Sequence, residues 1–83
     1  MQVTVLYFAS VREVVGLASE PWQTQASTVA QLRQELLARG APWADALDSA
    51  RHLRCAVNQT MVAPETPIAA GDEVAFFPPV TGG

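Results

Sequence analysis

The last three residues, Thr81, Gly82 and Gly83, are the part of this 83-residue sequence best suited to chemistry. A Gly-Gly end has no side chain to pack and loses much conformational entropy when it is ordered, so it adds nothing to a core. Without Cβ atoms, such an end fits a narrow slot in another protein and presents its α-carboxyl group there. We therefore interpret Gly83 as the reactive group and Gly82, with Thr81, as its slender neck. The alternative is a frayed terminus, because chain ends are often disordered.

The segment before this tail is suited to aim it. Residues 73–77 alternate as a strand, with Phe76 and Phe77 on opposite faces. Pro78 and Pro79 then hold the backbone extended and remove two hydrogen-bond donors. A stiff outlet loses less entropy than a floppy one when the tail enters a slot. Prolines also punctuate strand ends in general, so they support this interpretation without establishing it.

Conventional catalytic and metal-binding sets are missing from the sequence. His52 and Cys55 are the single histidine and the single cysteine, and neither has a second ligand type at metal spacing. Cys55 is on the inward phase of a predicted strand, where apolar surroundings suppress thiolate formation, which favours a structural thiol over a sulfur-relay nucleophile. We interpret His52 as a surface or capping residue. The acidic residues of the predicted short helix and of a predicted turn are expected to be solvated: Asp45, Asp48, Asp72 and Glu73.

The elements that must position the tail follow from hydrophobic periodicity. Strands are predicted at residues 2–9, 17–25, 53–58, 61–62 and 73–77, with turns at Asn58-Gln59 and Gly71-Asp72. Pro21 confines the second strand to an edge or a bulge. The first strand turns Leu6 and Phe8 outward, because they share a phase with the polar Gln2 and Thr4.

One long helix is predicted at residues 28–39. Thr28 and Gln31 form a capping box at its start, and Gly40 fits the left-handed position after its end. Its predicted inward face consists of Val29, Leu32, Leu36 and Leu37, whereas Arg33, Glu35 and Arg39 are expected to point away. Shorter helical segments are predicted at 10–15, with Ser10 as N-cap and Gly16 at its end, and after Pro42.

This order of elements predicts an α+β fold, a mixed sheet with one main helix packed on one face. The first and last strands are expected to pair in the centre of the sheet. The chain length favours a single domain, residues 1–83, with a flexible C-terminal tail at residues 80–83. Phe77 is then expected near Phe8 and Leu6 on the outer face, with Met61 extending the patch. That patch is either an interface or a second minor core covered by loops or by the helix that contains Trp43.

Composition excludes several classes of function. The net charge is −3 and the five basic residues, all arginine, form no cluster, so nucleic-acid binding is not expected. No apolar run approaches a membrane span, and a single cysteine fits a reducing cytoplasm. A hydrophobic fraction of 49% is high for so short a chain and favours a protein partner. The absence of lysine fits an arginine- and alanine-rich composition, and it leaves an activated Gly83 no ε-amine on a sister chain.

Three motifs resemble the family of molybdopterin synthase small subunits. They are Val57-Asn58-Gln59, the run GDEVAFFPPVTGG at 71–83, and Tyr7-Phe8-Ala9 followed by Val11-Arg12-Glu13. The similarity extends over nearly the whole chain. The C-terminal run is very specific, although Gly-Gly alone is shared by many ubiquitin-like proteins.

The resemblance implies a β-grasp, ubiquitin-like fold and a sulfur carrier in molybdenum cofactor biosynthesis. An adenylating enzyme would join Gly83 to AMP, using ATP and Mg²⁺ that belong to that enzyme, so this chain would bind no cofactor or metal of its own. A persulfide from a sulfurtransferase or desulfurase would then replace AMP and leave a thiocarboxylate. In a pocket of the large subunit, two successive carriers would convert cyclic pyranopterin monophosphate into the molybdopterin dithiolene. The implied assembly is a heterotetramer of two small and two large subunits, in which this chain donates sulfur and the large subunit holds the catalytic pocket.

The resemblance also implies a partner surface. Phe8, Arg12, Met61 and Phe77, with Pro78 and Pro79 leading to the tail, would contact the large subunit or the activating enzyme, so the two partners should compete. Arg12 by itself reads as a solvated charge, and lysines that the family often carries are absent. Three alternatives remain: a sulfur carrier for thiamine thiazole synthesis, a ubiquitin-like modifier of other proteins' lysines, and a binding module with an inert tail.

Overall fold

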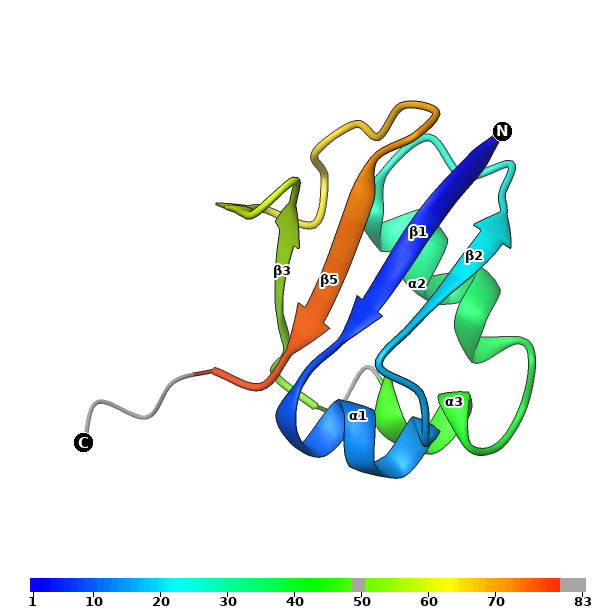
Figure 1. The fold of residues 1–83 in the computed structure, drawn as a ribbon, viewed down its shortest axis with the longest axis vertical. Coiled ribbons are helices and arrows are strands. Elements are labelled where there is room, and N and C mark those ends of the chain that lie inside the picture. The colour runs from blue at the N-terminus through cyan, green and yellow to red at the C-terminus, as the bar shows by residue number, and fades with distance from the viewer. Residues whose placement is uncertain (49–50, 80–83) are drawn as a thin grey trace.

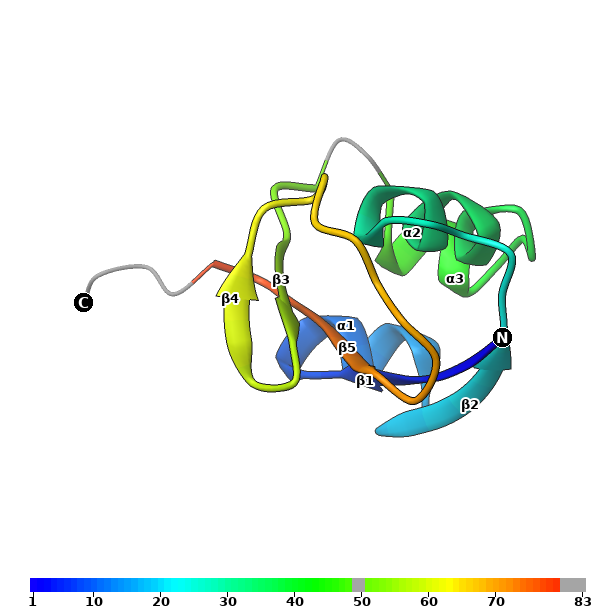
Figure 2. The ribbon, with the colours of Figure 1, turned by 90° about the horizontal axis from the view of Figure 1, so that it is seen from above.

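Five strands form one twisted sheet with helices behind it (Figure 1) in the computed structural model, which describes residues 1–48 and 51–79. The elements in chain order are β1 (Gln2–Tyr7), α1 (Ala9–Val15), β2 (Ser19–Gln23), α2 (Val29–Leu37), α3 (Trp43–Ala46), β3 (Arg54–Val57), β4 (Thr60–Val62) and β5 (Glu73–Phe77). Figure 2 shows α2 and α3 together on one side of the sheet. The predicted α+β arrangement, with its main helix on one face, is confirmed.

The sheet order is β2-β1-β5-β3-β4, and β1 and β5 run parallel at its centre. The other neighbours are antiparallel. The predicted central pairing of the first and last strands is therefore confirmed. Pro21 lies in β2, an edge strand, as its missing N–H requires. The last strand is thus paired with β1 up to Phe76 and with β3 up to Phe77, immediately before the proline outlet.

The caps of α2 follow the prediction. The Gln31 backbone N–H donates to Thr28 Oγ1 at 3.2 Å, and the Ser27 N–H donates to Gln31 Oε1 at 2.7 Å. Beyond the end of the helix, Gly40 has φ +83°, a conformation that favours glycine. The Thr28 side chain therefore satisfies the orphan N–H group of Gln31, and the Gln31 side chain reaches back to Ser27, the residue before the N-cap.

The prediction for α1 is wrong at its start. The helix begins at Ala9 instead of Ser10, and its N-cap is Phe8, which gives no side-chain cap. The Phe8 carbonyl instead accepts the N–H groups of Val11 at 3.1 Å and Arg12 at 3.3 Å. The chain turns directly from β1 into α1, so Phe8 itself occupies the corner. At the other end of the helix, Gly16 is the C-cap with φ +84°, as predicted.

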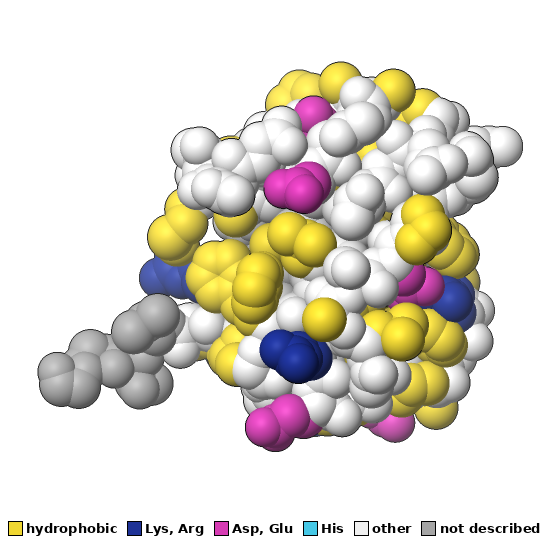
Figure 3. Space-filling view, viewed as in Figure 1, with side chains coloured by type: hydrophobic (Ala, Val, Ile, Leu, Met, Phe, Trp, Pro, Cys, Tyr) yellow, Lys and Arg dark blue, Asp and Glu magenta, His cyan; other side chains and the backbone are white. Residues whose placement is uncertain are grey.

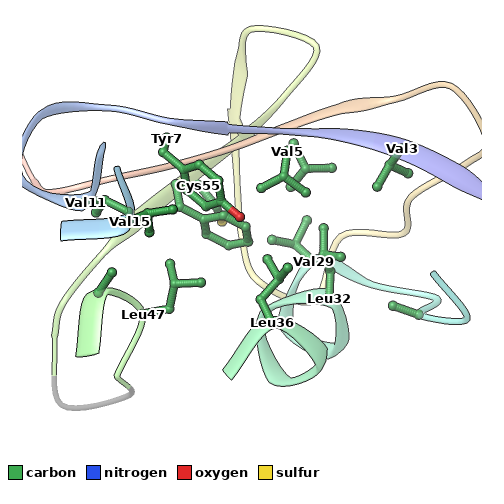
Figure 4. Packing of buried hydrophobic residues seen from close by; sticks show 14 of the residues in the cluster. Val3, Val5, Tyr7, Val11, Val15, Val29, Leu32, Leu36, Leu47 and Cys55 are labelled. Carbon is green, nitrogen blue, oxygen red and sulfur yellow. The ribbon is translucent and has the colours of Figure 1, made fainter. Parts of the chain in front are cut away.

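The core lies between α2 and the inner face of the sheet (Figure 4). Val3, Val5 and Tyr7 of β1 point toward Leu32 and Leu36 of α2, and all five are 1% exposed or less. Full burial of each such side chain contributes about 1.5–3 kcal/mol to folding. Val11, Val15 and Leu47 close the lower end of this core, and Val74 and Phe76 of β5 complete it. The packed core holds β1 and β5 rigidly in place.

Three polar side chains of α2 and its C-terminal turn do not point away from the body as predicted. Arg33 donates from Nε to the Leu47 carbonyl at 2.7 Å. Glu35 accepts hydrogen bonds from Trp22 Nε1 at 2.9 Å and Thr24 Oγ1 at 2.6 Å. The prediction for Arg33, Glu35 and Arg39 is wrong because neighbouring segments cover both flanks of α2, and all three side chains are half-buried.

Arg39 is the centre of a charged and aromatic cluster that the sequence did not reveal. Its guanidinium carbon lies 3.5 Å from the Trp43 ring centroid and 4.6 Å from that of Trp22. Glu20 Oε2 accepts hydrogen bonds from Arg39 Nη1 at 2.9 Å, Tyr7 Oη at 2.8 Å and Trp43 Nε1 at 3.1 Å. We call these residues the Glu20 cluster, and it joins β2 to the segment between α2 and α3: Tyr7, Glu20, Trp22, Arg39 and Trp43.

The Glu20 cluster shifts two ionisations. Burial opposes the ionisation of Glu20, but the hydrogen bonds from Tyr7, Arg39 and Trp43 outweigh it and lower the pKa of this carboxyl group. Burial of the Tyr7 phenol, with its hydrogen bond to Glu20, raises the pKa of Tyr7. The cluster is therefore an ionised carboxylate held by three donors, and it belongs to the scaffold.

Candidate docking surface and tail outlet

An exposed aromatic ring and a half-buried one meet where β5 ends. The rings of Phe8 and Phe77 have centroids 6.5 Å apart and an interplanar angle of 83°, the edge-to-face arrangement that aromatic pairs favour. Phe8 is 48% exposed and Phe77 is half-buried. Pro78 and Pro79 follow directly, so this pair borders the start of the tail. The prediction that Phe77 lies near Phe8 is confirmed.

Strand register assembles the rest of this surface. In the parallel pair Leu6 lies beside Ala75, and in the antiparallel pairs Ala56 lies between Ala75 and Met61. Residues at paired positions project from the same face of a sheet. We call the resulting set the outer patch: Leu6, Phe8, Ala56, Met61, Ala75 and Phe77. Figure 3 shows hydrophobic side chains gathered on this face, over β1 and β5.

The outer patch is not a second core. Met61 is 59% exposed, and α2 and α3 lie on the opposite side of the sheet (Figure 2). The helix that contains Trp43 does not cover the patch, and Trp43 instead donates a hydrogen bond to Glu20 in the Glu20 cluster. A contiguous apolar patch of this kind on a small domain is typical of a protein interaction surface. This geometry supports the first of the two sequence-based interpretations.

The predicted site residues fall into three groups. Phe8, Phe77 and the adjoining prolines come together, and Met61 joins them through Ala56 and Ala75. Arg12 is exposed on α1, one helical turn after Phe8, whose carbonyl accepts the Arg12 N–H at 3.3 Å. Thr81, Gly82 and Gly83 lie outside the described residues. The contacts predicted for this surface with other proteins stay predictions.

Cys55 is buried, as its strand phase predicted. It is 7% exposed, and its Sγ donates to the Val62 carbonyl at 3.3 Å. Burial raises the pKa of this thiol, although the nearby Arg33 opposes the shift. A thiol with these properties is a poor nucleophile at neutral pH. His52 is exposed, in line with its interpretation as a surface residue.

The turn that starts β5 is more ordered than the sequence suggested. Asp72 was expected to be solvated, yet its Oδ1 accepts from Asn58 Nδ2 at 3.0 Å and its Oδ2 from the Ala69 N–H at 2.8 Å. Asn58 Oδ1 in turn accepts the Glu73 N–H at 3.0 Å. Asn58 and Gln59 both have positive φ angles, 50° and 71°, which confirms the predicted turn. These bonds fix the β3–β4 turn to the start of β5.

One charged residue beside the outer patch was missed. Arg54 pairs with Phe77 across β3 and β5, and its side chain is exposed. The alternation of the third strand contained this signal, because Arg54 is on the opposite phase from Cys55.

Across residues 1–48 and 51–79, no helix is long and apolar enough to cross a membrane. The same residues contain no group of three or more histidine, cysteine or acidic side chains placed to hold a metal ion.

Comparison with known proteins gives full-length matches. The sequence is 49% identical to the molybdopterin synthase sulfur carrier subunit of Escherichia coli (strain K12) over 98% of this chain and 99% of that protein. It is 41% identical to the Haemophilus influenzae protein of the same name over the same shares. The crystal structure of the small archaeal modifier protein 1 of Haloferax volcanii superimposes on this chain with a TM-score of 0.76 at 27% identity, covering 95% of this chain and 98% of that one. These neighbours confirm the predicted β-grasp, ubiquitin-like fold, and residues 5–83 match the family model described as the ThiS family. The chain therefore belongs to the ThiS family, among the relatives of the molybdopterin synthase sulfur carrier subunits.

Proposed function

We propose that this chain is the sulfur carrier subunit of a molybdopterin synthase. The observation that carries the proposal is the 49% identity to a protein of that name over essentially the full length of both chains. The outer patch supports it, because an exposed aromatic pair next to the proline outlet is suited to dock the body while the tail enters a partner.

Gly83 carries the chemistry in this proposal. Its carboxylate is a poor electrophile, so an adenylating enzyme uses ATP and Mg²⁺ to form the acyl-adenylate and release pyrophosphate. A sulfur nucleophile then attacks the acyl carbon, and AMP leaves with its bonding electron pair. If the sulfur arrives as a protein persulfide, a thiol must reduce the resulting S–S bond before the thiocarboxylate is free. ATP and Mg²⁺ are bound by the activating enzyme, and the sulfur comes from a sulfurtransferase or desulfurase.

The large synthase subunit receives the thiocarboxylate in a pocket. The sulfur attacks cyclic pyranopterin monophosphate, and water hydrolyses the acyl–sulfur bond and restores the Gly83 carboxylate. Two carriers in succession supply both dithiolene sulfurs within a heterotetramer of two small and two large subunits. This chain supplies the reagent and the docking surface, while the catalytic pocket is in the large subunit.

The direct test is the intact mass of the chain after incubation with the activating enzyme, ATP and a sulfur donor. We expect one oxygen of the Gly83 carboxyl group to be exchanged for sulfur, and addition of the large subunit and pterin precursor to reverse the exchange. A chain that keeps its original mass under conditions that load a known sulfur carrier would contradict the proposal. If it loads but serves only a thiamine thiazole synthase, it is a sulfur carrier of another pathway.

A second candidate function is protein modification. The likeness to the H. volcanii small archaeal modifier protein 1, at 27% identity, is the specific observation in its favour. A modifier forms a stable isopeptide bond between Gly83 and a lysine of another protein. Covalent adducts that survive reducing denaturation in cell extracts, in the absence of thiocarboxylate, would support this candidate over the carrier.

A further inference from the structure

Arg54 occupies a distinctive place on the outer face of the sheet. It is the residue of β3 that pairs with Phe77, so both side chains project from the face that carries the outer patch. Its side chain is exposed, and within residues 1–48 and 51–79 it forms no hydrogen bond or ion pair. An arginine beside an exposed aromatic ring and without a partner in its own chain is available to a carboxylate of another protein.

The other arginines sharpen this contrast. Arg33, Arg39 and Arg51 all donate to acceptors within the chain, at 2.7 Å to Leu47, 2.9 Å to Glu20 and 2.7 Å to Asp45 respectively. In the described residues, Arg12 and Arg54 alone keep their guanidinium groups free, and both adjoin the Phe8–Phe77 pair. Figure 3 shows arginine side chains on two sides of the hydrophobic patch.

The opposite end of the same face is acidic. Glu73 starts β5 on the outward phase and pairs with Thr4. Phe77 is the fourth residue after Glu73, which is a distance of about 13 Å along a strand. Figure 3 shows carboxylates at the upper end of this face, and others at the lower edge of the view beyond the hydrophobic patch. The outer face thus carries a charge gradient along β5, positive where the tail leaves and negative at the far end.

We propose that Arg54 is a partner-recognition residue, and that it pairs with a carboxylate of the large synthase subunit beside the opening that admits the tail. This inference rests on the proposed function. The gradient from Glu73 to Arg54 then orients the docking chain so that its tail end meets the opening. Exposed ion pairs add little affinity, so the effect is expected mainly in the association rate and the orientation of the encounter.

The experiment measures association of the full-length chain with the large subunit by surface plasmon resonance. We expect Arg54→Glu to lower the association rate about tenfold at low salt, and the deficit to shrink at about 1 M salt, where the Debye length is about 3 Å. Arg51→Glu is the matched control, because it makes the same change in net charge on an exposed residue whose side chain donates to Asp45. The thermal midpoint of each variant reports whether it is folded.

A double variant separates the gradient from net charge. Arg54→Glu with Glu73→Arg keeps the net charge and reverses the gradient, so we expect an association rate at least as low as that of Arg54→Glu alone. A rate restored to that of the wild type would show that only net charge matters and would overturn the proposal.

Three other outcomes would also overturn it. They are an unchanged rate for Arg54→Glu, an equal loss for Arg51→Glu, and a loss seen only with the activating enzyme. If the wild-type chain accepts sulfur and binds the large subunit but Arg54→Glu behaves like it, only the role of Arg54 fails. If the wild-type chain does neither, the proposed function fails and this inference fails with it.

Discussion

The two faces of the central strands β1 and β5 differ in burial, although the same strands form both faces. On the inner face Val74 and Phe76 of β5 are 0% and 1% exposed, and they belong to the same core as Leu32 and Leu36 of α2. On the outer face Phe77 meets an exposed Phe8, and neither α2 nor α3 covers this face. Successive side chains of a strand point to opposite faces, so the packed core on the inner face also holds the outer surface in place. Stability and docking are therefore divided between adjacent residues of one strand.

Deletion of Gly83 is expected to have the largest effect and to leave both faces intact. Sulfur transfer to the pterin precursor should be abolished, because the reactive carboxyl group is then no longer at the end of a Gly-Gly neck. The thermal midpoint should stay nearly unchanged, since the packed core ends with β5. Intact mass and calorimetry measure the two quantities. A large loss of stability, or persistent sulfur delivery, would contradict the division of roles.

Phe76→Ala and Phe77→Ala test the two faces with one substitution on adjacent residues. Phe76→Ala should lower the free energy of unfolding by about 3–5 kcal/mol, because it opens a cavity in the core. Phe77→Ala should lower it by about 1 kcal/mol or less, through loss of the ring contact with Phe8. Denaturant titration measures both values.

The same two variants should also differ in how they bind the large subunit. Phe77→Ala should weaken binding to the large subunit by about 2 kcal/mol or more, roughly thirtyfold in Kd. Phe76→Ala should bind normally under conditions where it is folded. Titration calorimetry supplies the dissociation constants. Equal stability losses for the two variants would place Phe77 in a core after all.

Glu20→Gln tests the inner scaffold through pH. The hydrogen bonds from Tyr7, Arg39 and Trp43 lower the pKa of Glu20 below 4.5, the ordinary value of a glutamate side chain. Their stabilisation is therefore fully present above that value and is lost as the pH falls through the lower pKa of the folded state. At neutral pH the variant should lose about 1–3 kcal/mol, and its deficit should shrink as the pH falls below 4.5.

Thermal unfolding across this pH range checks the Glu20 prediction. Glu13→Gln is the control, since Glu13 is exposed on α1. A deficit for Glu20→Gln that does not change with pH would mean that the cluster stabilises by packing alone. Binding to the large subunit should be the same for both variants, because the Glu20 cluster lies away from the outer patch.

Cys55→Ala is expected to have the smallest effect on function. The thiol is buried and its pKa is raised, so sulfur loading at Gly83 should proceed at the wild-type rate. Loss of the small buried side chain should lower the unfolding free energy by about 1 kcal/mol. Loading kinetics followed by intact mass provide the check. A large fall in the loading rate of the folded variant would revive the sulfur-relay interpretation of Cys55.

Local patterns predicted most of the fold. The bounds of β5 match the predicted strand, and the Thr28 capping box, the Asn58-Gln59 turn and the edge position of Pro21 are confirmed. The predicted start of α1 was wrong, because the Phe8 carbonyl caps the helix in place of the Ser10 side chain. The prediction that Arg33 points away failed because other segments cover the flank of α2.

The sequence by itself determined the order of the elements, the face of each strand that is apolar and four members of the outer patch, Leu6, Phe8, Met61 and Phe77, because periodicity and turn chemistry act over a few residues. The tertiary structure alone decided that Phe8 and Phe77 touch, that Glu20 gathers three donors, and that Arg54 lies beside the outer patch without a partner in the described chain. Those contacts join residues more than ten positions apart, and strand register and helix docking set them.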